Sequence, residues 1–191
     1  MNEHIRVRRA HHDDLRAIGT TLARSFQDDP VFTWCVPDAE HRRTVLPAFF
    51  GSVAEGLLSA DEVFVAGVTA RPVTPAVDGA ALWIPPSAET GGALDLEQLF
   101  GNDVERVGEL VAMMEEHHPT VPHHYLWFLG VDPAAQGRGI GSTLLEAAAP
   151  GPAYLEATSK DNRRLYERHG FEVVDELAVG SSPPLWAMWR P

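Results

Sequence analysis

The chain has 191 residues, of which 45% are hydrophobic and 22% are charged. This length and composition are typical of one globular domain, which we place at residues 1–191, and they exclude a disordered or low-complexity protein. The 27 acidic residues outnumber the 15 basic ones and give a net charge of −12 at pH 7. Such an excess argues against a nucleic-acid partner, because phosphate backbones select for basic surfaces.

We expect neither a membrane span nor a secretion signal in this sequence. No apolar run approaches the roughly 20 residues that cross a bilayer, and the first fifteen residues are dense in charged residues and histidine. The single cysteine, Cys35, cannot form an internal disulfide, and it lies between Trp34 and Val36 as a core residue does. We therefore expect a cytoplasmic monomer or homodimer with no membrane partner.

Periodic patterns predict the elements of the first third of the chain. An alternating pattern at residues 5–8 indicates a half-buried strand, and a helix with Asp13 as its N-cap continues to about Gln27. A second helix follows Asp38. The connection between the two helices, residues 28–37, is aromatic and irregular, which is typical either of the wall of a ligand cleft or of a loop anchored in the core.

The middle of the chain predicts two strands and a helical region. The strands cover residues 62–68 and 79–84, and residues 94–116 have a helical pattern in two segments. Four histidines then bracket two prolines: His117, His118, His123 and His124. No HExxH motif and no partnering cysteine accompanies them, so we predict no metal site.

A strand, a glycine loop and the start of a helix follow one another at residues 126–145, LWFLGVDPAAQGRGIGSTLL. Pro133 ends the strand because it lacks a backbone donor. Alternating glycines then leave the amides of residues 137–142 exposed where the helix begins, an arrangement that binds anions and above all phosphate. The glycine spacing matches neither the dinucleotide-binding fingerprint nor the P-loop.

The succession of strand, Val-Asp-Pro, Q-x-x-G-x-G and helix resembles the pyrophosphate loop of the Gcn5-related N-acetyltransferases, the GNAT superfamily. A second stretch at residues 154–173, YLEATSKDNRRLYERHGFEV, resembles the strand and short helix that form the other wall of the coenzyme site in that family. Many members carry an asparagine seven residues before the tyrosine of this stretch, where this chain has Ser159. This variant and the opening RVRRAHHDDL are similar to the puromycin N-acetyltransferase branch.

The resemblance implies an α+β fold, also described as a three-layer α/β fold. Its mixed, mostly antiparallel sheet has helices on both faces, and its central strands at residues 124–131 and 153–158 splay apart to admit the coenzyme. The implied cosubstrate is acetyl-CoA, without a metal. The implied coenzyme-binding residues lie in the central strand, the glycine loop and the last helix: Leu129, Gly130, Val131, Gln136, Gly137, Arg138, Gly139, Ile140, Gly141, Ser142, Ser159, Asn162 and Tyr166.

The implied function is an acyltransferase that moves an acetyl group to a primary amine of a small molecule by direct attack on the thioester. The alternatives are a protein or peptide N-acetyltransferase and a non-catalytic acyl-CoA-binding module, and Tyr166 argues against the last of these. In the family, Tyr166 corresponds to the acid that serves the departing thiolate. The base stays open among several residues: Tyr125, His124, Glu156, Asp28 and Asp29.

We expect the acceptor to bind where the segments 28–37, 69–124 and 176–185 meet. The acidic balance favours a cationic amine. Four aromatic residues offer ring faces to an ammonium group, although the place of the last one inside the central strand is more typical of the core: Phe32, Trp34, Trp83 and Trp127.

Overall fold

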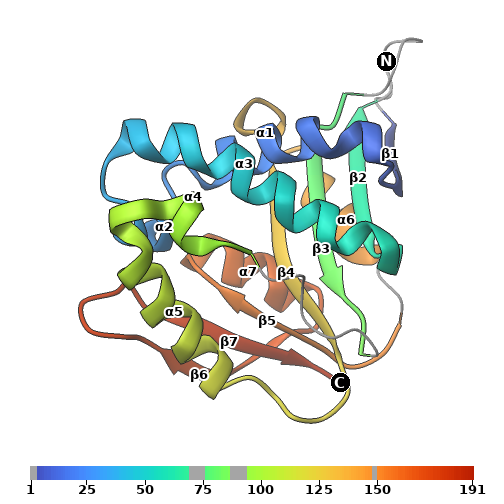
Figure 1. Ribbon diagram of the computed structural model, residues 1–191. Helices are drawn as coiled ribbons and strands as arrows, with labels where there is room; N and C mark the ends of the chain where they lie inside the picture. The colour runs from blue at the N-terminus through green and yellow to red at the C-terminus, as the bar shows by residue number, and fades with distance from the viewer. Residues whose placement is uncertain (1–3, 69–75, 87–93, 148–149) are drawn as a thin grey trace.

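A computed structural model gives the fold (Figure 1), and it describes residues 4–68, 76–86, 94–147 and 150–191. Residues 69–75 and 87–93 belong to a segment that we expect to contact the acceptor, and they lie outside the described residues. So do residues 148–149, at the end of the helix predicted for 142–149.

Seven strands form one sheet in the order β1-β2-β3-β4-β5-β7-β6. Every neighbouring pair is antiparallel except β4 and β5, which are parallel. The sheet is therefore mixed and mostly antiparallel, as the sequence predicts. The strands are β1 (Ile5–Arg9), β2 (Val63–Val68), β3 (Gly79–Ile84), β4 (His124–Val131), β5 (Ala153–Ala157), β6 (Glu172–Leu177) and β7 (Leu185–Arg190).

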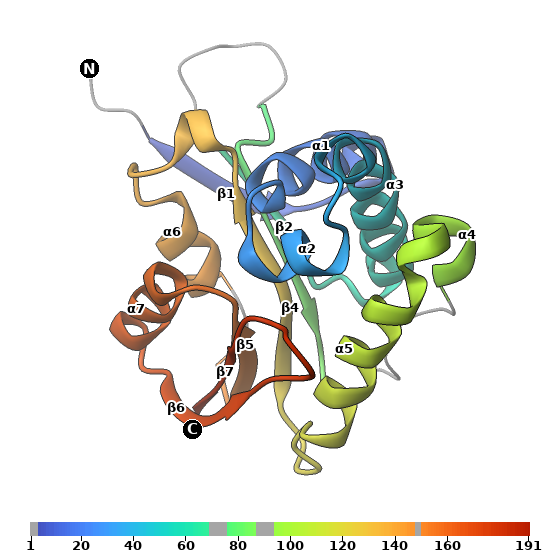
Figure 2. The same cartoon turned by 90° about the vertical axis from the view of Figure 1, so that its left-hand side faces the viewer.

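Helices cover both faces of the sheet, as Figure 2 shows. Two helices lie on one face, α6 (Ile140–Glu146) and α7 (Lys160–Arg168). The opposite face carries α1 (Leu15–Phe26), α2 (Pro30–Cys35), α3 (Ala39–Leu57), α4 (Leu96–Phe100) and α5 (Val104–Glu116). Each face buries its own apolar cluster, because successive residues of a strand point to opposite sides. The predicted fold class is confirmed.

Two details near the N-terminus correct the sequence prediction. The first helix begins at Leu15 after a 3-10 turn over His12–Asp14, so its N-cap is Asp14 and not Asp13. Asp14 also accepts two hydrogen bonds from the Arg8 guanidinium at 2.6 and 2.7 Å, which lower the pKa of its carboxyl. The connection at 28–37 is not irregular, because it contains α2.

The helices α1 and α3 approach each other closely enough to exclude a side chain. A Cβ atom on Gly19 would lie 2.4 Å from the carbonyl oxygen of Pro47, which stands inside α3. Gly130 allows a similar approach of β4 to α1, since a Cβ atom there would lie 2.8 Å from the side chain of Leu22. These contacts fix α1 against both its neighbouring helix and the sheet.

Within the described residues, no helix has the length and apolar composition that crossing a membrane requires.

The close approach of α1 and α3 predicts opposite effects for two glycine substitutions. Gly19→Ala should destabilise the protein by about 1–3 kcal/mol, because its Cβ meets a backbone atom that cannot rotate away. Gly51→Ala should stabilise it by about 0.5–1 kcal/mol, because alanine favours the helix and the new Cβ would lie 3.9 Å from the nearest atom, the carbonyl oxygen of Leu15. Urea denaturation of both variants measures the effects, and equal stabilities would contradict the close packing.

Candidate active site

The glycine loop between β4 and α6 is exposed and leaves open space beside its backbone. Gly137 and Gly139 have φ angles of +77° and +87°, which glycine adopts at little cost. A Cβ atom on Gly137 would meet nothing within 4 Å, and one on Gly139 would meet only the Ile5 side chain at 3.8 Å. Gln136 Nε2 donates to the carbonyl of Val131 at 3.1 Å and ties the loop to the strand. This geometry fits a phosphate group.

The two parallel strands separate directly after they meet. They pair only at His124 with Ala153 and at Tyr125 with Tyr154. On its other edge β4 stays paired with β3 as far as Val131. Among the described residues, the part of β4 that contains residues 129–131 therefore has no partner strand on the β5 side, and this gap lies where the coenzyme arm is expected.

A β-bulge in β4 turns two consecutive aromatic side chains to the same face. Leu82 stands opposite Phe128 and Trp83 opposite Leu126, so Trp127 is the extra residue of β4. The rings of Trp127 and Phe128 stack with their centroids 5.4 Å apart, and both line a cavity. Trp127 is thus a wall residue, and its expected place in the core is wrong.

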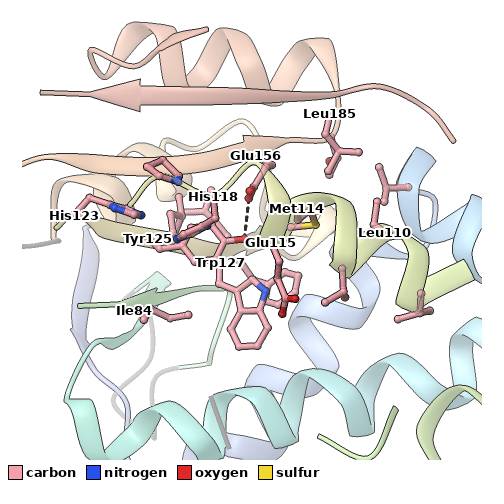
Figure 3. Close-up of a pocket in the computed structure, with 18 of the residues that line it drawn as sticks. Ile84, Leu110, Met114, Glu115, His118, His123, Tyr125, Trp127, Glu156 and Leu185 are labelled. Carbon is pink, nitrogen blue, oxygen red and sulfur yellow. Dashed lines mark hydrogen bonds between the residues drawn. The ribbon is translucent and has the colours of Figure 1, made fainter. Parts of the chain in front are cut away.

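This cavity has a volume of about 740 Å³ and reaches both faces of the sheet. On one face it lies between the sheet and α5 (Figure 3), and on the other it is lined by Asn162 and Tyr166 of α7. It therefore passes through the sheet where β4 and β5 separate. Its size suits a small organic ligand.

Glu156 of β5 presents a carboxyl group to the cavity. Tyr125 Oη donates to Glu156 Oε2 at 2.8 Å (Figure 3), and Glu156 Oε1 is buried. Burial outweighs the hydrogen bonding from Tyr125 and Tyr154 and raises the pKa of Glu156 to about 7. Glu156 therefore gains and loses its proton near neutral pH, as a general base does.

Tyr125 itself is a donor in this pair. Burial raises the pKa of Tyr125 well above 10, and the negative charge of Glu156 adds to the effect. The phenol is protonated at neutral pH and orients the carboxylate. Among the sequence candidates for the base, Tyr125 is therefore placed as a hydrogen-bond donor to Glu156.

Two histidines lie next to the Tyr125–Glu156 pair, on the side away from Leu185 (Figure 3). The rings of His118 and His123 are 4.9 Å apart, and the His118 ring meets Tyr125 edge-on at 4.8 Å. Burial lowers the pKa of His118, which favours its neutral form. In the part of the chain that the structure describes, no three His, Cys, Asp or Glu side chains are grouped to hold a metal.

His124 points away from this cavity. It precedes Tyr125 on β4, and neighbouring strand residues alternate between faces. Its ring lies near Gly151 on the opposite face, and it is absent from the cavity lining. The placement of His124 does not favour it as a base for a ligand in this cavity.

Tyr166 faces the gap from α7. Its side chain is buried and lines the cavity, and burial together with the charge of Asp29 raises the pKa of its phenol above 10. The phenol is therefore protonated throughout the neutral range. The side chains of Tyr166 and Glu156 therefore line the same cavity from the two sides of the gap.

Asp29 is used in the structure as a helix cap. Its Oδ1 accepts hydrogen bonds from the amides of Val31 and Phe32 at the start of α2, and its Oδ2 accepts one from Thr158 Oγ1 at 2.5 Å. It joins α2 to the end of β5 and does not line the cavity, while Asp28 is exposed to solvent. Neither carboxylate is placed to face the acceptor.

Ser159 and Asn162 begin α7. The Ser159 hydroxyl accepts a hydrogen bond from the Asn162 amide at 3.2 Å and is the N-cap of the helix. Asn162 lines the cavity and donates through Nδ2 to Thr158 Oγ1 at 3.4 Å. Of the two, Asn162 offers its side chain to the gap.

Only some of the four aromatic residues expected around the acceptor line the cavity. Phe32 and Trp127 line the cavity. Trp34 does not, and its indole N–H donates to Ser181 Oγ at 3.2 Å. Trp83 is fully buried in the apolar cluster on the α6–α7 face, because the alternation of β3 points it away from the cavity.

Cys35 is buried, and burial raises the pKa of its thiol to about 12, so it is not a nucleophile at neutral pH.

A family model described as an acetyltransferase (GNAT) domain matches residues 97–173, which contain β4, the glycine loop, α6, β5 and α7. The chain therefore contains a GNAT acetyltransferase domain, the domain of an acyltransferase. GNAT enzymes use acetyl-CoA as cosubstrate, and the open glycine loop and the β4–β5 gap fit this coenzyme. The narrower assignment to the puromycin N-acetyltransferase branch stays a prediction.

Solved structures of other acetyltransferases share the fold of this GNAT protein over its whole length. A Corynebacterium glutamicum protein described as histone acetyltransferase HPA2 and related acetyltransferase is 27% identical, with 98% of this chain and 96% of that chain covered and a TM-score of 0.72. Arylalkylamine N-acetyltransferase 2 from Aedes aegypti is 14% identical, with 97% and 98% covered and a TM-score of 0.66. An agmatine N-acetyltransferase is 17% identical, with 97% and 98% covered and a TM-score of 0.61.

Proposed function

We propose that this GNAT protein transfers the acetyl group of acetyl-CoA to a primary amine of a small molecule. The observation that carries the proposal is the cavity of about 740 Å³ that joins a carboxyl group titrating near neutral pH, Glu156, to a protonated phenol, Tyr166. The arylalkylamine and agmatine N-acetyltransferases that share the fold are named for small amines, which supports the same acceptor class here.

Residues on both sides of the gap hold the coenzyme in this proposal. The exposed amides of the glycine loop, residues 137–142, bind its pyrophosphate. The unpartnered edge of residues 129–131 donates and accepts hydrogen bonds along the pantetheine arm and polarises the thioester carbonyl. Bound acetyl-CoA supplies the activated acyl group, and holding both reactants together supplies much of the rate.

Glu156 is the base in this proposal. Its carboxylate takes the proton that the amine loses when the amine nitrogen bonds to the thioester carbon. Tyr125 is a positioning residue, because its phenol holds Oε2 in place. A pKa of about 7 keeps a large share of Glu156 ionised at neutral pH and still basic enough to accept a proton.

Tyr166 serves the leaving group. As the carbon–sulfur bond breaks, its phenol donates a hydrogen bond to the departing sulfur, which ends as the free thiol. A thiol has a pKa of about 8.5, which lies below that of the buried phenol. The phenol therefore stabilises the developing thiolate mainly by hydrogen bonding, and solvent restores any proton that it gives up.

One assay separates the candidate functions. Release of the coenzyme thiol is followed with acetyl-CoA and a panel of aminonucleosides, aminoglycosides, polyamines, arylalkylamines and peptides with free N-termini. Transfer to small amines supports the proposal. Transfer to peptides alone would replace it with a peptide N-acetyltransferase, and coenzyme binding without transfer to any amine would leave an acyl-CoA-binding module.

Gly139→Asp should abolish coenzyme binding. The substitution places a side chain at a φ angle of +87° and a negative charge where the pyrophosphate is expected. Calorimetry should show an affinity for acetyl-CoA that is weaker by roughly 100-fold or more, because two phosphate contacts are lost and a like charge is added. Gly180→Asp is a matched control at φ +56° with open space around it, and it should bind normally. Unchanged binding by folded Gly139→Asp protein would refute the loop assignment.

Tyr166→Phe should lower kcat by about 10-fold or more, because it removes the hydrogen bond that stabilises the developing thiolate. The ring that lines the cavity is kept and only the donor is removed, so the affinity for acetyl-CoA should change little. Steady-state thiol release and calorimetry test both statements. Wild-type turnover in the variant would exclude a role for the phenol in the reaction.

Glu156→Gln should lower kcat/KM by about 10²- to 10⁴-fold, the range of a positioned base. The wild-type profile of kcat/KM against pH should rise with an apparent pKa of about 7, and this limb should be absent from the variant. A residue with a purely structural role would not remove that limb. A wild-type profile in the variant would assign the proton transfer to another group.

The same variant should be more stable than wild type above pH 7. The folded pKa of Glu156, about 7, lies above the unfolded value of about 4.3, so the wild type loses stability as pH rises through 7, whereas Gln has no proton to lose. The gain at pH 8 should be about 4 kcal/mol, since each unit between the two pKa values is worth about 1.4 kcal/mol, and it should vanish near pH 4. Thermal melts at both pH values measure it.

A further inference from the structure

The cavity has a reactive polar end and an apolar far end. Glu156, Tyr125 and the two histidines His118 and His123 lie together near the start of the β4–β5 gap. Leu110 and Leu185 lie on the other side of the Tyr125–Glu156 pair (Figure 3). An amine that reaches Glu156 must therefore place the rest of its body against apolar side chains.

Phenylalanines form the inner wall of the apolar end. Phe128 of β4 stands at their centre, with its ring centroid 5.1 to 6.4 Å from those of four others. The four come from α1, α2 and α3, and all but Phe50 line the cavity: Phe26, Phe32, Phe49 and Phe50. Trp127, which the bulge turns to the same face, extends this wall. Such rings favour an apolar or aromatic body in edge and face contacts.

The outer wall comes from α5, which packs mainly against α2 and α4. It contributes Val107, Leu110 and Met114 to the cavity. These side chains hold no charge and no strong hydrogen-bonding group, and methionine adapts its shape to different ligands. The described lining contains no lysine or arginine, and its carboxylates are Glu156 at the reactive end and the exposed Glu115.

We propose that the acceptor is a monoamine whose single ammonium group sits on a bulky apolar or aromatic body. This inference rests on the proposed function and narrows its substrate class. A second ammonium among the phenylalanines would be buried without a carboxylate beside it, because the α5 carboxylate of the described lining, Glu115, is exposed, and such burial is strongly unfavourable. The hydroxyl groups of an amino sugar would lose water without finding partners.

Matched amines test the proposal in the full-length enzyme. Hexylamine and hexamethylenediamine have the same chain and differ in one terminal amine. Hexylamine should have the higher kcat/KM by roughly 100-fold or more, because the diamine buries an unpaired charge. Phenethylamine should be at least as good an acceptor as hexylamine, because its ring packs on the phenylalanine wall.

A carboxylate added to the cavity side of α5 should make the enzyme accept the diamine better. Met114→Glu places a carboxylate on the α5 wall of the cavity, on the same side of the Tyr125–Glu156 pair as Leu110 (Figure 3). By pairing with the second ammonium, this carboxylate should raise the ratio of kcat/KM for hexamethylenediamine to kcat/KM for hexylamine by about 10-fold or more. Ala112→Glu adds the same charge to the exposed side of the same helix and should leave the ratio unchanged. If circular dichroism shows that Met114→Glu is unfolded, Leu110→Glu takes its place.

The outcomes separate this inference from the function on which it rests. If hexamethylenediamine or an aminoglycoside is acetylated as well as hexylamine, the enzyme is an amine acetyltransferase and only the monoamine inference is overturned. A folded Met114→Glu enzyme with the wild-type ratio overturns it too, because the far end of the acceptor then lies elsewhere. If no amine of any class is acetylated, the proposed function falls and the inference falls with it.

Discussion

The structure depends on one constraint, the separation of β4 and β5 after two paired residues. Strands in a sheet satisfy their backbone groups by pairing, so an early separation leaves donors and acceptors of β4 without protein partners on one edge. The separation also opens the sheet, and a single cavity then connects α7 on one face with α2, α3 and α5 on the other. A donor bound at the glycine loop and an acceptor bound under α5 can meet only because this gap exists.

Glu156 shows how the fold sets the chemistry of the gap. It lies on β5 beyond the last residue paired with β4, so its carboxyl faces the cavity while its backbone stays paired with β7. Burial in this position raises the pKa of the carboxyl, and Tyr125, one strand away, fixes its orientation. In the proposed function, the same burial suits Glu156 to the role of base and makes its charged form unfavourable for stability, as is common at active sites.

Sequence patterns predicted the parts of the site that are local. The glycine loop follows from turn chemistry within a short window. The short helix with Tyr166 and the mixed, mostly antiparallel sheet follow from the resemblance to the GNAT family. The short helix α2 also had a local signal, an aspartate before a proline, which is a common start of a helix. The density of aromatic residues in the same segment favoured an irregular connection instead.

The remaining parts depend on register between distant strands, which a single sequence does not contain. The bulge at Trp127 is defined only by the pairing of β4 with β3, and it decides that Trp127 faces the cavity while Trp83 does not. Register likewise decides that Tyr125 faces Glu156 and that His124 faces the other side. The sequence therefore does not distinguish the five candidates for the base, whereas the fold places them differently relative to the cavity.

The phenylalanines around Phe128 pack the core and also line the cavity, so a change in them affects both the site and the stability of the domain. Phe26, Phe49 and Phe50 are buried and hold α1 and α3 together above the sheet, while the cavity sides of Phe26 and Phe49 form the wall for the acceptor. A change that enlarges this wall removes core packing, which costs about 3–5 kcal/mol for a phenylalanine replaced by alanine. The side chains of α5 are only partly buried apart from Val107 and Met113, and they can vary at a lower cost. Changes of acceptor specificity in this fold are therefore more readily made on α5 than on the phenylalanine wall.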